Sequence, residues 1–437
     1  MYAHQNDASM TTTTNTYGVQ MIQWMRDLWS YPRSLTGHGT LDTLKYLKGI
    51  NKDLNIFSFK SGTNVFDWSI PDEWNIYNAY IEHESGQRFA EFSESNLHIL
   101  GYSIPYNNYL SLAELLPHIY TQIDQPDVIP YVTSYYKDNW GFCMSENDKN
   151  NLSEGRYHVV IDSKKKPGAM HLADLVVKGE SNEEIFFSTY VCHPSMANNE
   201  LSGPALATAL IQYIKSNYKK PKYTYRFVFV PETIGSITYL SQNLEHLQKQ
   251  VICGFNLSCV GDDRAYSHIE SRIGNTLADN ALQSALIGFD NAVKYSFLER
   301  GSDERQYCSP GVDLPLCGFC RTKYGEYPEY HTSADNFDVV TKEGIDGSFD
   351  VISTIIDAFE FNLFPKINVI CEPQLGKRGL RSDISKKESI QEGKIRSDFI
   401  AYADGENSIF DISNRIKKNL KAVVEEAKIL EKYNLLS

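Results

Sequence analysis

The stretch that decides the fold is IFFSTYVCHPSMANNELSGPALATALI, residues 185–211. It opens with a continuous apolar run over 185–191, which predicts a strand buried on both faces. A polar segment follows, and Leu206, Leu210 and Ile214 then recur at helical spacing, which predicts a helix over 201–214. A buried strand followed directly by a helix indicates the βαβ unit of a parallel sheet.

The same alternation continues toward the C-terminus. Further strands are expected over 225–230 and 251–260, and further helices over 237–247, 276–292 and 347–361. Strands that alternate with helices predict a largely parallel sheet with helices on both of its faces. The expected fold class is therefore α/β, with an αβα sandwich at its centre.

Changes in sequence texture divide the chain into parts. Residues 1–17 are polar and rich in Thr and Asn, which predicts a disordered tail. Residues 18–61 begin with helical spacing, and the α/β pattern occupies 161–364. We expect these two segments to form one domain.

Residues 62–160 have a different pattern, because Pro and Gly punctuate short aromatic and β-branched runs. This pattern predicts an inserted all-β domain, either a small sandwich or a jelly roll. Its expected elements are strands over 76–81, 96–102 and 129–136, with a helix near 110–121.

Residues 365–437 offer three short helices with a tight turn, Asp404-Gly405, before the second. This arrangement resembles a winged-helix or helix-turn-helix module. Its lysines make it locally basic, which suits either DNA reading or an ordinary solvated face. Packing or contact with a protein is the preferred role, because the whole chain is acidic.

Composition excludes several classes of protein. The 437 residues are 42% hydrophobic and 22% charged, which is typical of a globular chain and not of a coiled coil or collagen. The formal net charge of −13 argues against nucleic acid as the main partner. We expect no signal peptide and no membrane span, and hence a cytoplasmic location. A homo-oligomer is an open alternative.

Polar side chains follow several of the expected strands, where ligands bind in parallel α/β sheets. His193 and Glu200 follow the strand over 185–191, Glu232 follows the next strand, and His331 comes after an irregular segment. Imidazole and carboxylate are ligands for zinc, and a carboxylate at a strand end can act as a general base. Each residue alone has a structural alternative, such as a loop hydrogen bond or a favourable charge at a helix N-terminus.

Three further residues are candidate substrate contacts. Arg305 could bind a substrate carboxylate through its two-pronged guanidinium, although a surface ion pair would explain it equally well. Asp303 lies in the same polar segment, and Tyr330 precedes His331. Asp335 could orient His331 or cap the helix that follows.

These segments, in this order, resemble the zinc aminopeptidase fold related to glutamate carboxypeptidase. The matching positions are His193, Gly203, Glu232, Gly235 and the motif Tyr330-His331-Thr332. The resemblance implies a mixed, largely parallel sheet, a zinc-dependent hydrolysis of a peptide or amide bond, and zinc as the cofactor.

More closely, residues 18–437 resemble a bacterial group of aminopeptidase-like proteins that often accompany surface-polysaccharide biosynthesis genes. That group has an inserted β-domain and a C-terminal winged helix. The motifs that carry the resemblance are FDWSIPDEW at 66–74, YVTSYY at 131–136, WGFC at 140–143 and GSDER at 301–305.

The sequence departs from the peptidase pattern at three acidic ligands. Asn199 stands where the resemblance implies a metal-bridging Asp, Thr233 where it implies a ligating Glu, and Ser258 where it implies a third acid. Glu200 and Asp262 are candidate replacements for one of them. We therefore expect one zinc ion, held by His193, His331 and a carboxylate, with a two-ion site as the alternative. Asn199 and Glu200 stay among the candidate ligands.

Two functions lead from the sequence, and a third, a transcription regulator with a sensor domain, rests only on the winged-helix resemblance. The first is a metal-dependent hydrolase that cleaves a small peptide or an amide on a sugar-linked precursor, with Glu232 as the general base. If Glu232 is itself a ligand, the base is unassigned. The second is a degenerate peptidase fold that serves as a ligand-binding or scaffold protein.

Overall fold

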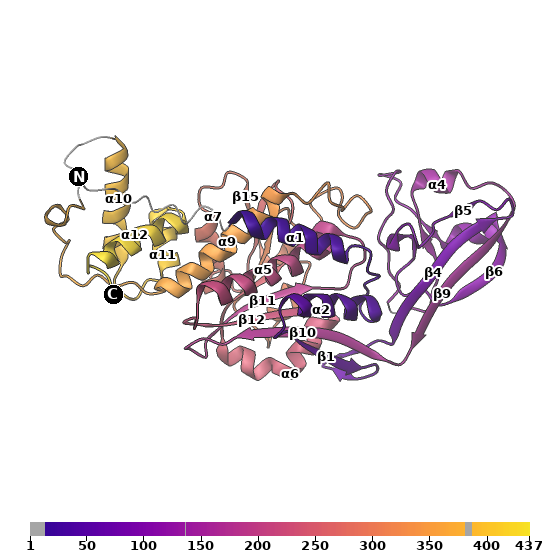
Figure 1. The fold of residues 1–437 in the computed structure, drawn as a ribbon, viewed down its shortest axis with the longest axis horizontal. Coiled ribbons are helices and arrows are strands. Elements are labelled where there is room, and N and C mark those ends of the chain that lie inside the picture. Colours follow the sequence, from indigo (N-terminus) through magenta and orange to yellow (C-terminus); the bar gives the residue numbers. More distant parts are fainter. Residues whose placement is uncertain (1–13, 136, 381–386) are drawn as a thin grey trace, which may run out of the picture.

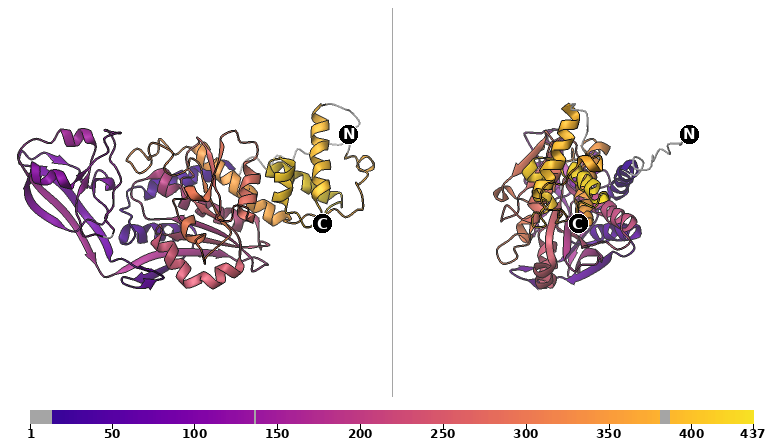
Figure 2. Two further views of the ribbon diagram at one scale, coloured as in Figure 1. Left: turned by 180° about the vertical axis from the view of Figure 1, so that it is seen from behind. Right: turned by 90° about the vertical axis from the view of Figure 1, so that its left-hand side faces the viewer.

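The computed structural model describes residues 14–135, 137–380 and 387–437. The molecule is elongated, with three parts in a row (Figure 1). An α/β domain lies in the middle, a β-rich insert at one end and a small helical module at the other. The view from behind and the end-on view in Figure 2 show the same arrangement.

The α/β domain is built on an eight-stranded sheet, counted over the described residues, with the order β1-β10-β12-β11-β13-β16-β14-β15. The strands β12, β11, β13 and β16 run parallel, and antiparallel neighbours extend the sheet at each side. The predicted mixed, largely parallel sheet is thereby confirmed. The strand bounds are β1 Asn55–Lys60, β10 Ala169–Val177, β11 Glu184–Tyr190, β12 Thr224–Val230, β13 Val251–Leu257, β14 Tyr266–Ile269, β15 Ala292–Tyr295 and β16 Leu316–Cys320.

Helices cover both faces of this sheet. Ile185 and Phe187 of β11 pack into the larger core, while Phe186 between them packs into a separate core on the opposite face. This is why β11 is buried along its whole length, as its apolar run predicted. The larger core takes helices α1 Thr14–Leu28, α2 His38–Ile50, α5 Ser202–Asn217, α7 Leu277–Leu286 and α9 Lys342–Phe361, and the smaller one takes α6 Ile234–Gln250 and α8 Glu304–Tyr307.

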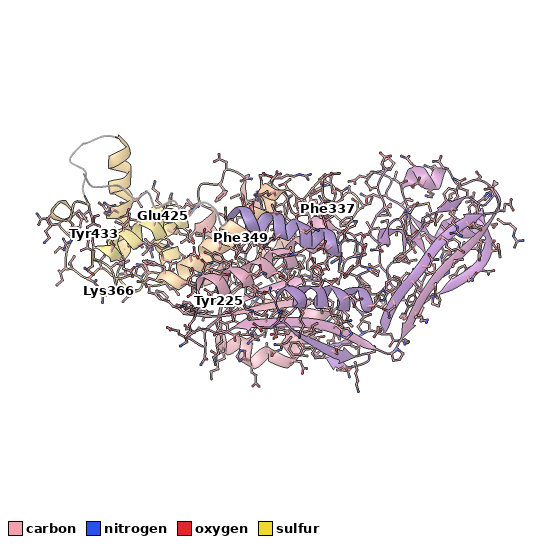
Figure 3. All side chains as sticks on the ribbon, in the orientation of Figure 1. Tyr225, Phe337, Phe349, Lys366, Glu425 and Tyr433 are labelled. Atoms are coloured by element: carbon pink, nitrogen blue, oxygen red, sulfur yellow. The ribbon has the colours of Figure 1, made fainter. Side chains whose placement is uncertain are left out.

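Side chains fill the space between the layers (Figure 3). Phe349 of α9 stacks on Tyr17 of α1 at 4.7 Å and meets the ring of Tyr213 of α5 edge-on at 5.5 Å. Aromatic contacts of this kind tie the three helices into one layer. Helix α1 begins at Thr14, so residues 14–17, expected in the tail, are helical, and residues 1–13 lie outside the described part.

One helix was predicted too long. The helix expected over 276–292 ends at Leu286, and Ala292–Tyr295 forms the edge strand β15. Gly288 adopts a φ of +89°, a left-handed conformation that suits glycine and breaks the helix. The apolar spacing beyond Leu286 thus belongs to a turn and a short strand.

The insert contains one four-stranded antiparallel sheet in the order β5-β4-β9-β6, in place of a two-sheet sandwich or jelly roll. Its strands are β4 Glu73–His83, β5 Arg88–Phe89, β6 Tyr106–Ser111 and β9 Arg156–Lys166. Short pairs accompany it: β2 Asn64–Val65 with β3 Trp68–Ser69, and β7 Ile119–Tyr120 with β8 Phe142–Cys143. Loops and short helices cover its inner face. The described residues of the insert contain no second full sheet.

Two of the strands predicted in the insert are not formed. Residues 96–98 form a short 3-10 helix capped by Ser95, and residues 129–135 make only isolated bridges. The region 110–121, expected to be a helix, divides into strand, two short helices α3 Leu112–Leu115 and η2 Leu116–His118, and strand. Aromatic and β-branched runs pack equally well in ordered loops, so the pattern did not separate loop from strand.

The C-terminal module has the three predicted helices, α10 Lys387–Tyr402, α11 Ile409–Ile416 and α12 Leu420–Lys432. Lys366 and Ile367 bridge to Asp404 and Leu436, which gives the module a small antiparallel ladder. A helix-turn-helix with such a ladder has the architecture of a winged helix.

The module docks on the α/β domain through its helix-turn-helix. Phe410 of α11 packs against Phe359 of α9 at 5.0 Å, and the buried side chains of both parts form one continuous core. At the start of α12, Asn419 donates hydrogen bonds to the carbonyls of Ala285 and Ile287, both at 2.9 Å. In DNA-binding helix-turn-helix proteins, the helix that corresponds to α12 reads the bases. Here the N-terminal end of α12 contacts α7.

The described residues contain no helix that is long and apolar enough to cross a membrane. All eight cysteines have free thiols, and Cys317 and Cys320 are buried in β16. Cys317 packs into the larger core and Cys320 into a separate small cluster of buried side chains.

Candidate active site

His193 leaves the carboxyl end of β11 and is buried. Its Nδ1 lies 2.9 Å from Glu200 Oε2, and its carbonyl accepts a hydrogen bond from Arg33 Nε at 2.9 Å. Its Nε2 lies 3.6 Å from Oε2 of Glu232. Burial, helped by the charge of Arg33, lowers the pKa of His193 to about 3, so the ring is neutral at pH 7.

Glu200 lies on the Nδ1 side of His193, away from the nitrogen that faces Glu232. It belongs to a π-helical turn, Ala197–Leu201, that leads into α5. Such turns often occur at functional sites. Burial raises the pKa of Glu200, and the nearby guanidinium of Arg33 opposes that shift. This carboxyl group is therefore placed to orient the imidazole, as carboxylates behind metal-binding histidines do.

Glu232 follows β12 on a strained turn. The next residue, Thr233, has a φ of +67°, which is costly for a β-branched residue. Asp303 stabilises this turn, because its Oδ1 accepts hydrogen bonds from the Thr233 N–H at 2.8 Å and the Ser236 hydroxyl at 2.7 Å. The Glu232 side chain is 23% exposed, and burial and the charge of Asp303 raise its pKa to about 8.

His331 approaches from the loop after β16. Its backbone φ is +57°, and its ring centroid lies 5.6 Å from that of His193. The ring stacks on Tyr330 at 3.9 Å. Burial, reinforced by the neighbouring His193, lowers the pKa of His331 to about 3. His193 thus has a second neutral imidazole on one side and the Glu232 carboxylate beside its Nε2.

The insert supplies a residue that the sequence analysis did not single out, Tyr131. Its ring meets both imidazoles edge-on, 5.2 Å from His193 and 5.2 Å from His331. Its N–H donates to the carbonyl of His331 at 2.8 Å, and its hydroxyl lies 2.8 Å from that of Tyr135. The motif YVTSYY contained this residue, but nothing local in the sequence marked it as part of the site.

Further hydrogen bonds hold the insert loop in place. Ile129 and Ser333 exchange two, from the Ser333 N–H to the Ile129 carbonyl and from the Ile129 N–H to the Ser333 hydroxyl, both at 2.9 Å. Gln125 also donates to the carbonyl of Pro328 at 2.9 Å. The two loops are therefore joined beside His331.

The three positions at which the peptidase pattern implies an acidic ligand lie near this centre. Asn199 accepts a hydrogen bond from the Tyr190 hydroxyl at 3.2 Å, and Thr233 accepts one from Arg305 at 2.8 Å. Ser258 pairs with Cys320. These neutral groups are satisfied by protein partners. They offer no charge that would hold a second dication.

Other candidates from the sequence have structural partners. Asp262 binds Asn198 and Thr322 and shapes the loop after β13. Asp335 accepts from the N–H groups of Asn198 and Asn199 at 2.6 and 3.0 Å, so it caps the turn that begins α5. Its contacts do not reach the ring of His331.

Arg305 and Asp303 lie beside Glu232 on the turn that begins α8. Arg305 donates to the Thr233 hydroxyl and to the carbonyl of Ser302. The second oxygen of Asp303, Oδ2, is buried without a hydrogen-bond partner. Both residues therefore support the Glu232 turn, and their role as substrate contacts stays a prediction.

Among the described residues, ligand atoms of Cys192, His193 and Glu200 lie within 4.8 Å of one another, whereas His193, Glu232 and His331 form no such group. By residue type, two imidazoles and a carboxylate suit one zinc ion. Two imidazoles that share a tetrahedral zinc have ring centroids roughly 5 to 6 Å apart, which agrees with the 5.6 Å between His193 and His331. Glu232 adds a carboxylate beside Nε2 of His193. Asn199, Thr233 and Ser258 are neutral and supply no carboxylate for a second ion.

A second group of potential ligands, His268, Asp279 and Cys317, lies under α7. Asp279 already accepts hydrogen bonds from Ser271 and Thr276 and from the ring of His268. These contacts cap α7, so this group is structural.

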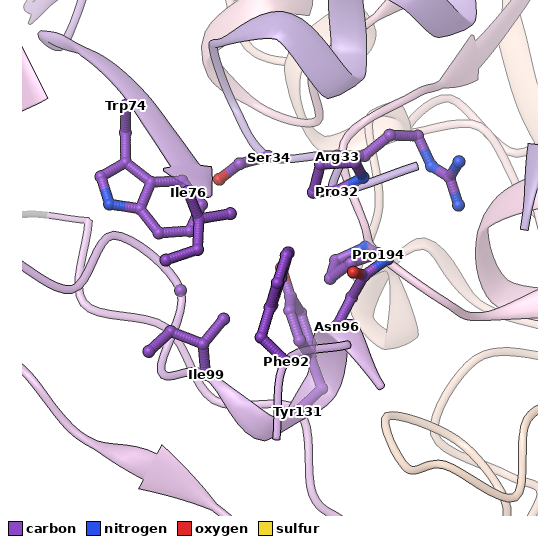
Figure 4. Close-up of a pocket in the computed structure, with 11 residues that line it drawn as sticks. Pro32, Arg33, Ser34, Trp74, Ile76, Phe92, Asn96, Ile99, Tyr131 and Pro194 are labelled. Carbon is purple, nitrogen blue, oxygen red and sulfur yellow. The ribbon is translucent and has the colours of Figure 1, made fainter. Parts of the chain in front are cut away.

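A small cavity separates the insert from the α/β domain (Figure 4). Its lining residues include Trp74, Phe92 and Tyr131 of the insert and Pro32 and Pro194 of the α/β domain. Its free space is about that of one water molecule. The guanidinium of Arg33 points away from the aromatic rings (Figure 4), so this cavity is a packing defect beside the site.

The fold and the site together define an aminopeptidase-like α/β protein. Comparison with solved structures agrees: a zinc aminopeptidase of Bacillus subtilis aligns with a TM-score of 0.57 at 14% identity, covering 78% of this chain and 94% of that one. A peptidase M28 precursor of Shewanella amazonensis aligns with a TM-score of 0.52 at 12% identity, covering 83% and 99%. At these identities the likeness shows the fold.

The chain belongs to the family described as a domain of unknown function, DUF4910, which matches residues 22–362, and residues 363–437 match a winged helix-turn-helix family. A Clostridium acetobutylicum protein is 37% identical over 96% of each chain, and its name combines polysaccharide biosynthesis with an aminopeptidase-like domain. A crystal structure of a protein from that organism, described as a peptidase, aligns with a TM-score of 0.88 at 36% identity, covering 97% of each chain. These matches confirm the resemblance and the winged helix.

Proposed function

We propose that this protein is a metal-dependent hydrolase of an amide or peptide bond, with one zinc ion held by His193 and His331 and with Glu232 as the general base. The observation that carries the proposal is the approach of Glu232 to Nε2 of His193 at 3.6 Å, beside a second neutral imidazole. When bound, zinc would polarise the carbonyl of the scissile amide and acidify a water molecule.

The residues of the chain have distinct parts in this proposal. Glu200 orients His193 through Nδ1, so that Nε2 faces the reaction centre. Glu232 takes a proton from the attacking water and returns it to the leaving amine. Burial and the charge of Asp303 raise the pKa of Glu232 toward neutral pH, where a general base works best. Tyr131 covers the two imidazoles and limits the access of water.

The proposed substrate class is supported by the name of a relative. Since the Clostridium protein is named for polysaccharide biosynthesis, the substrate proposed is an amide on a sugar-linked precursor, with a small peptide as the alternative. A cytoplasmic location accompanies this proposal.

The test combines metal analysis with Glu232→Gln. Protein purified without chelator should hold about one zinc per chain, and His193→Ala or His331→Ala should lose it, whereas His171→Ala on β10 should not. Hydrolysis is measured on a panel of aminoacyl anilides and N-acylated amino sugars. Glu232→Gln should lower the rate about 10²- to 10⁴-fold, and Glu245→Gln, an exposed site on α6, should leave it unchanged. A parental rate in Glu232→Gln would remove the general-base assignment.

The second candidate is a metal-free binding protein with a degenerate peptidase fold. Asn199, Thr233 and Ser258 favour it, because three acidic ligands implied by the peptidase pattern are absent. A chain that carries no zinc and cleaves nothing in the panel, yet binds one of its members in calorimetry, would establish this function instead.

A further inference from the structure

The insert sheet has one buried face and one open face. Ile81, Tyr157 and Val159 point inward to the core of the insert. The loops of the insert cover this inner side and lie toward the α/β domain (Figure 1). On the other face, the register places Glu82 of β4 opposite His158 of β9, and His158 opposite Tyr109 of β6. A row of polar and aromatic side chains therefore crosses three strands on the open face.

The aromatic part of this row is ordered by its neighbours. Tyr109 stacks on His158 with centroids 4.6 Å apart and an interplanar angle of 15°, yet 57% of the tyrosine stays exposed. His158 is held in turn by a 2.8 Å contact between its Nε2 and Oδ1 of Asn107. The guanidinium carbon of Arg156 lies 5.5 Å from the Tyr109 ring centroid. The ring is thus preorganised while much of its surface is free.

A groove of about 350 Å³ lies along this row. That volume is within the range of small-molecule sites. Its lining residues are Glu82, His83, Glu84, Gly86, Tyr109, Arg156 and His158. The groove therefore combines an aromatic ring with both donors and acceptors of hydrogen bonds.

The charges of the groove nearly cancel. Glu82 is paired with Arg88 at 2.6 Å, which leaves Glu84 as an acceptor and Arg156 as a donor. Within the described residues, no carboxylate lies within ion-pairing distance of the Arg156 guanidinium. An anionic ligand would meet Glu84, and a cationic ligand would meet Arg156. An uncharged ligand rich in hydroxyl groups can bind both, because a hydroxyl donates to carboxylates and accepts from guanidinium.

We propose that this open face of the insert is a binding site for an uncharged carbohydrate. A sugar ring offers an apolar C–H surface to Tyr109 and pairs of neighbouring hydroxyls to Glu84 and Arg156. The insert then carries two features on opposite sides of its sheet, this groove and the Tyr131 loop that reaches the candidate active site. The site does not depend on hydrolysis or on a bound metal.

The test is calorimetric titration of the full chain with neutral oligosaccharides, and with sialylated or phosphorylated oligosaccharides for comparison. Neutral sugars should bind with a Kd between micromolar and millimolar. Tyr109→Ala and Arg156→Gln should each weaken binding at least tenfold. Tyr77→Ala should change it less than twofold, because Tyr77 is 51% exposed on the same sheet but does not line the groove.

Several results would overturn the proposal. These are the absence of binding to neutral sugars at millimolar concentration, a preference for the charged sugars, or equal loss in Tyr77→Ala and Tyr109→Ala. Glu232→Gln and the zinc-free protein should bind as the parent does. Failure of the proposed hydrolase and failure of this site are therefore distinguishable. Unchanged melting temperatures of the three exposed variants exclude unfolding as the cause of a loss.

Discussion

Arg33 Nε lies 3.6 Å from Oε1 of Glu200, and neither side chain has any solvent exposure. The pair connects the loop after α1 to the turn that begins α5. Glu200 in turn holds Nδ1 of His193, and Arg33 holds the carbonyl of the same histidine. A buried ion pair is thus the support on which His193 is positioned.

The first prediction concerns this pair. At pH 9, above the Glu200 pKa of about 8, Glu200→Gln should destabilise the protein by about 3–5 kcal/mol, because it leaves the Arg33 charge buried without a counter-charge. The free energy of unfolding in urea measures the effect. Asp42→Asn breaks an exposed pair with Lys45 and should cost at most about 1 kcal/mol.

The double variant Arg33→Met/Glu200→Leu is the control for this explanation. It removes both charges, so it should recover much of the loss. A double variant that is less stable than Glu200→Gln would contradict the role of the charge.

The second prediction concerns Tyr131. Tyr131→Ala removes the ring that contacts both imidazoles and should weaken zinc binding about 10- to 100-fold, the usual effect of losing a group behind the ligands. Tyr131→Phe keeps the ring and should stay within a fewfold of the parent. Competition with a chromogenic chelator gives the affinities. An equal effect of both changes would assign the role to the hydroxyl.

The third prediction is a pH dependence of stability away from the site. Burial alone would raise the pKa of Asp279, but hydrogen bonds from His268 and Ser271 lower it to about 2. The unfolded pKa is about 3.9, so the unfolded state binds more protons between these values. Asp279 therefore contributes about 2 to 3 kcal/mol above pH 5, and this contribution disappears as the pH falls through 2.

Urea unfolding of Asp279→Asn checks this sign. The difference in stability between the parent and the variant should be largest at pH 6 and clearly smaller at pH 3. Asp290→Asn, at an exposed position near the end of α7, should show no such trend. A difference that grows toward low pH would show that the linkage has the opposite sign.

The fourth prediction concerns the docked winged helix. Phe410→Ala should cost about 3–5 kcal/mol, because it empties a fully buried site shared with α9. Since the core is continuous, calorimetry should show one unfolding transition for the α/β domain and the module. Phe364→Ala, at a half-exposed site, should change the stability by about 0.5 kcal/mol or less. Two separate transitions in the parent would contradict a common core.

Much of the α/β domain was predictable because its signals are local. The apolar run of β11 and the spacing of Leu206, Leu210 and Ile214 depend on neighbouring residues, and the structure confirms both. The end of the helix at Leu286 was missed, since the apolar spacing continued while Gly288 broke the helix. The insert was harder, because loops and strands there share one composition.

The candidate site was predictable in part. His193 and Glu232 follow strands that are parallel neighbours, so their approach followed from the topology. The position of Glu200 behind His193 did not follow from the topology. The π-helical turn decides which ring nitrogen of His193 the Glu200 carboxylate contacts. The contact of Tyr131 with the site could not be predicted for a different reason, since Tyr131 lies in a loop of the insert.

The sequence by itself determined the layers of the fold, the presence of His193 and Glu232 at strand ends and of a second histidine after an irregular segment, and the absence of three acids. These follow from local periodicity and from residue identity. Only the tertiary structure decided that Arg33, 160 residues away, supports His193, that Tyr131 covers both imidazoles and that the winged helix is docked on α7 and α9. The physical reason is that such contacts depend on how separately formed elements pack, and no short stretch of sequence encodes that packing.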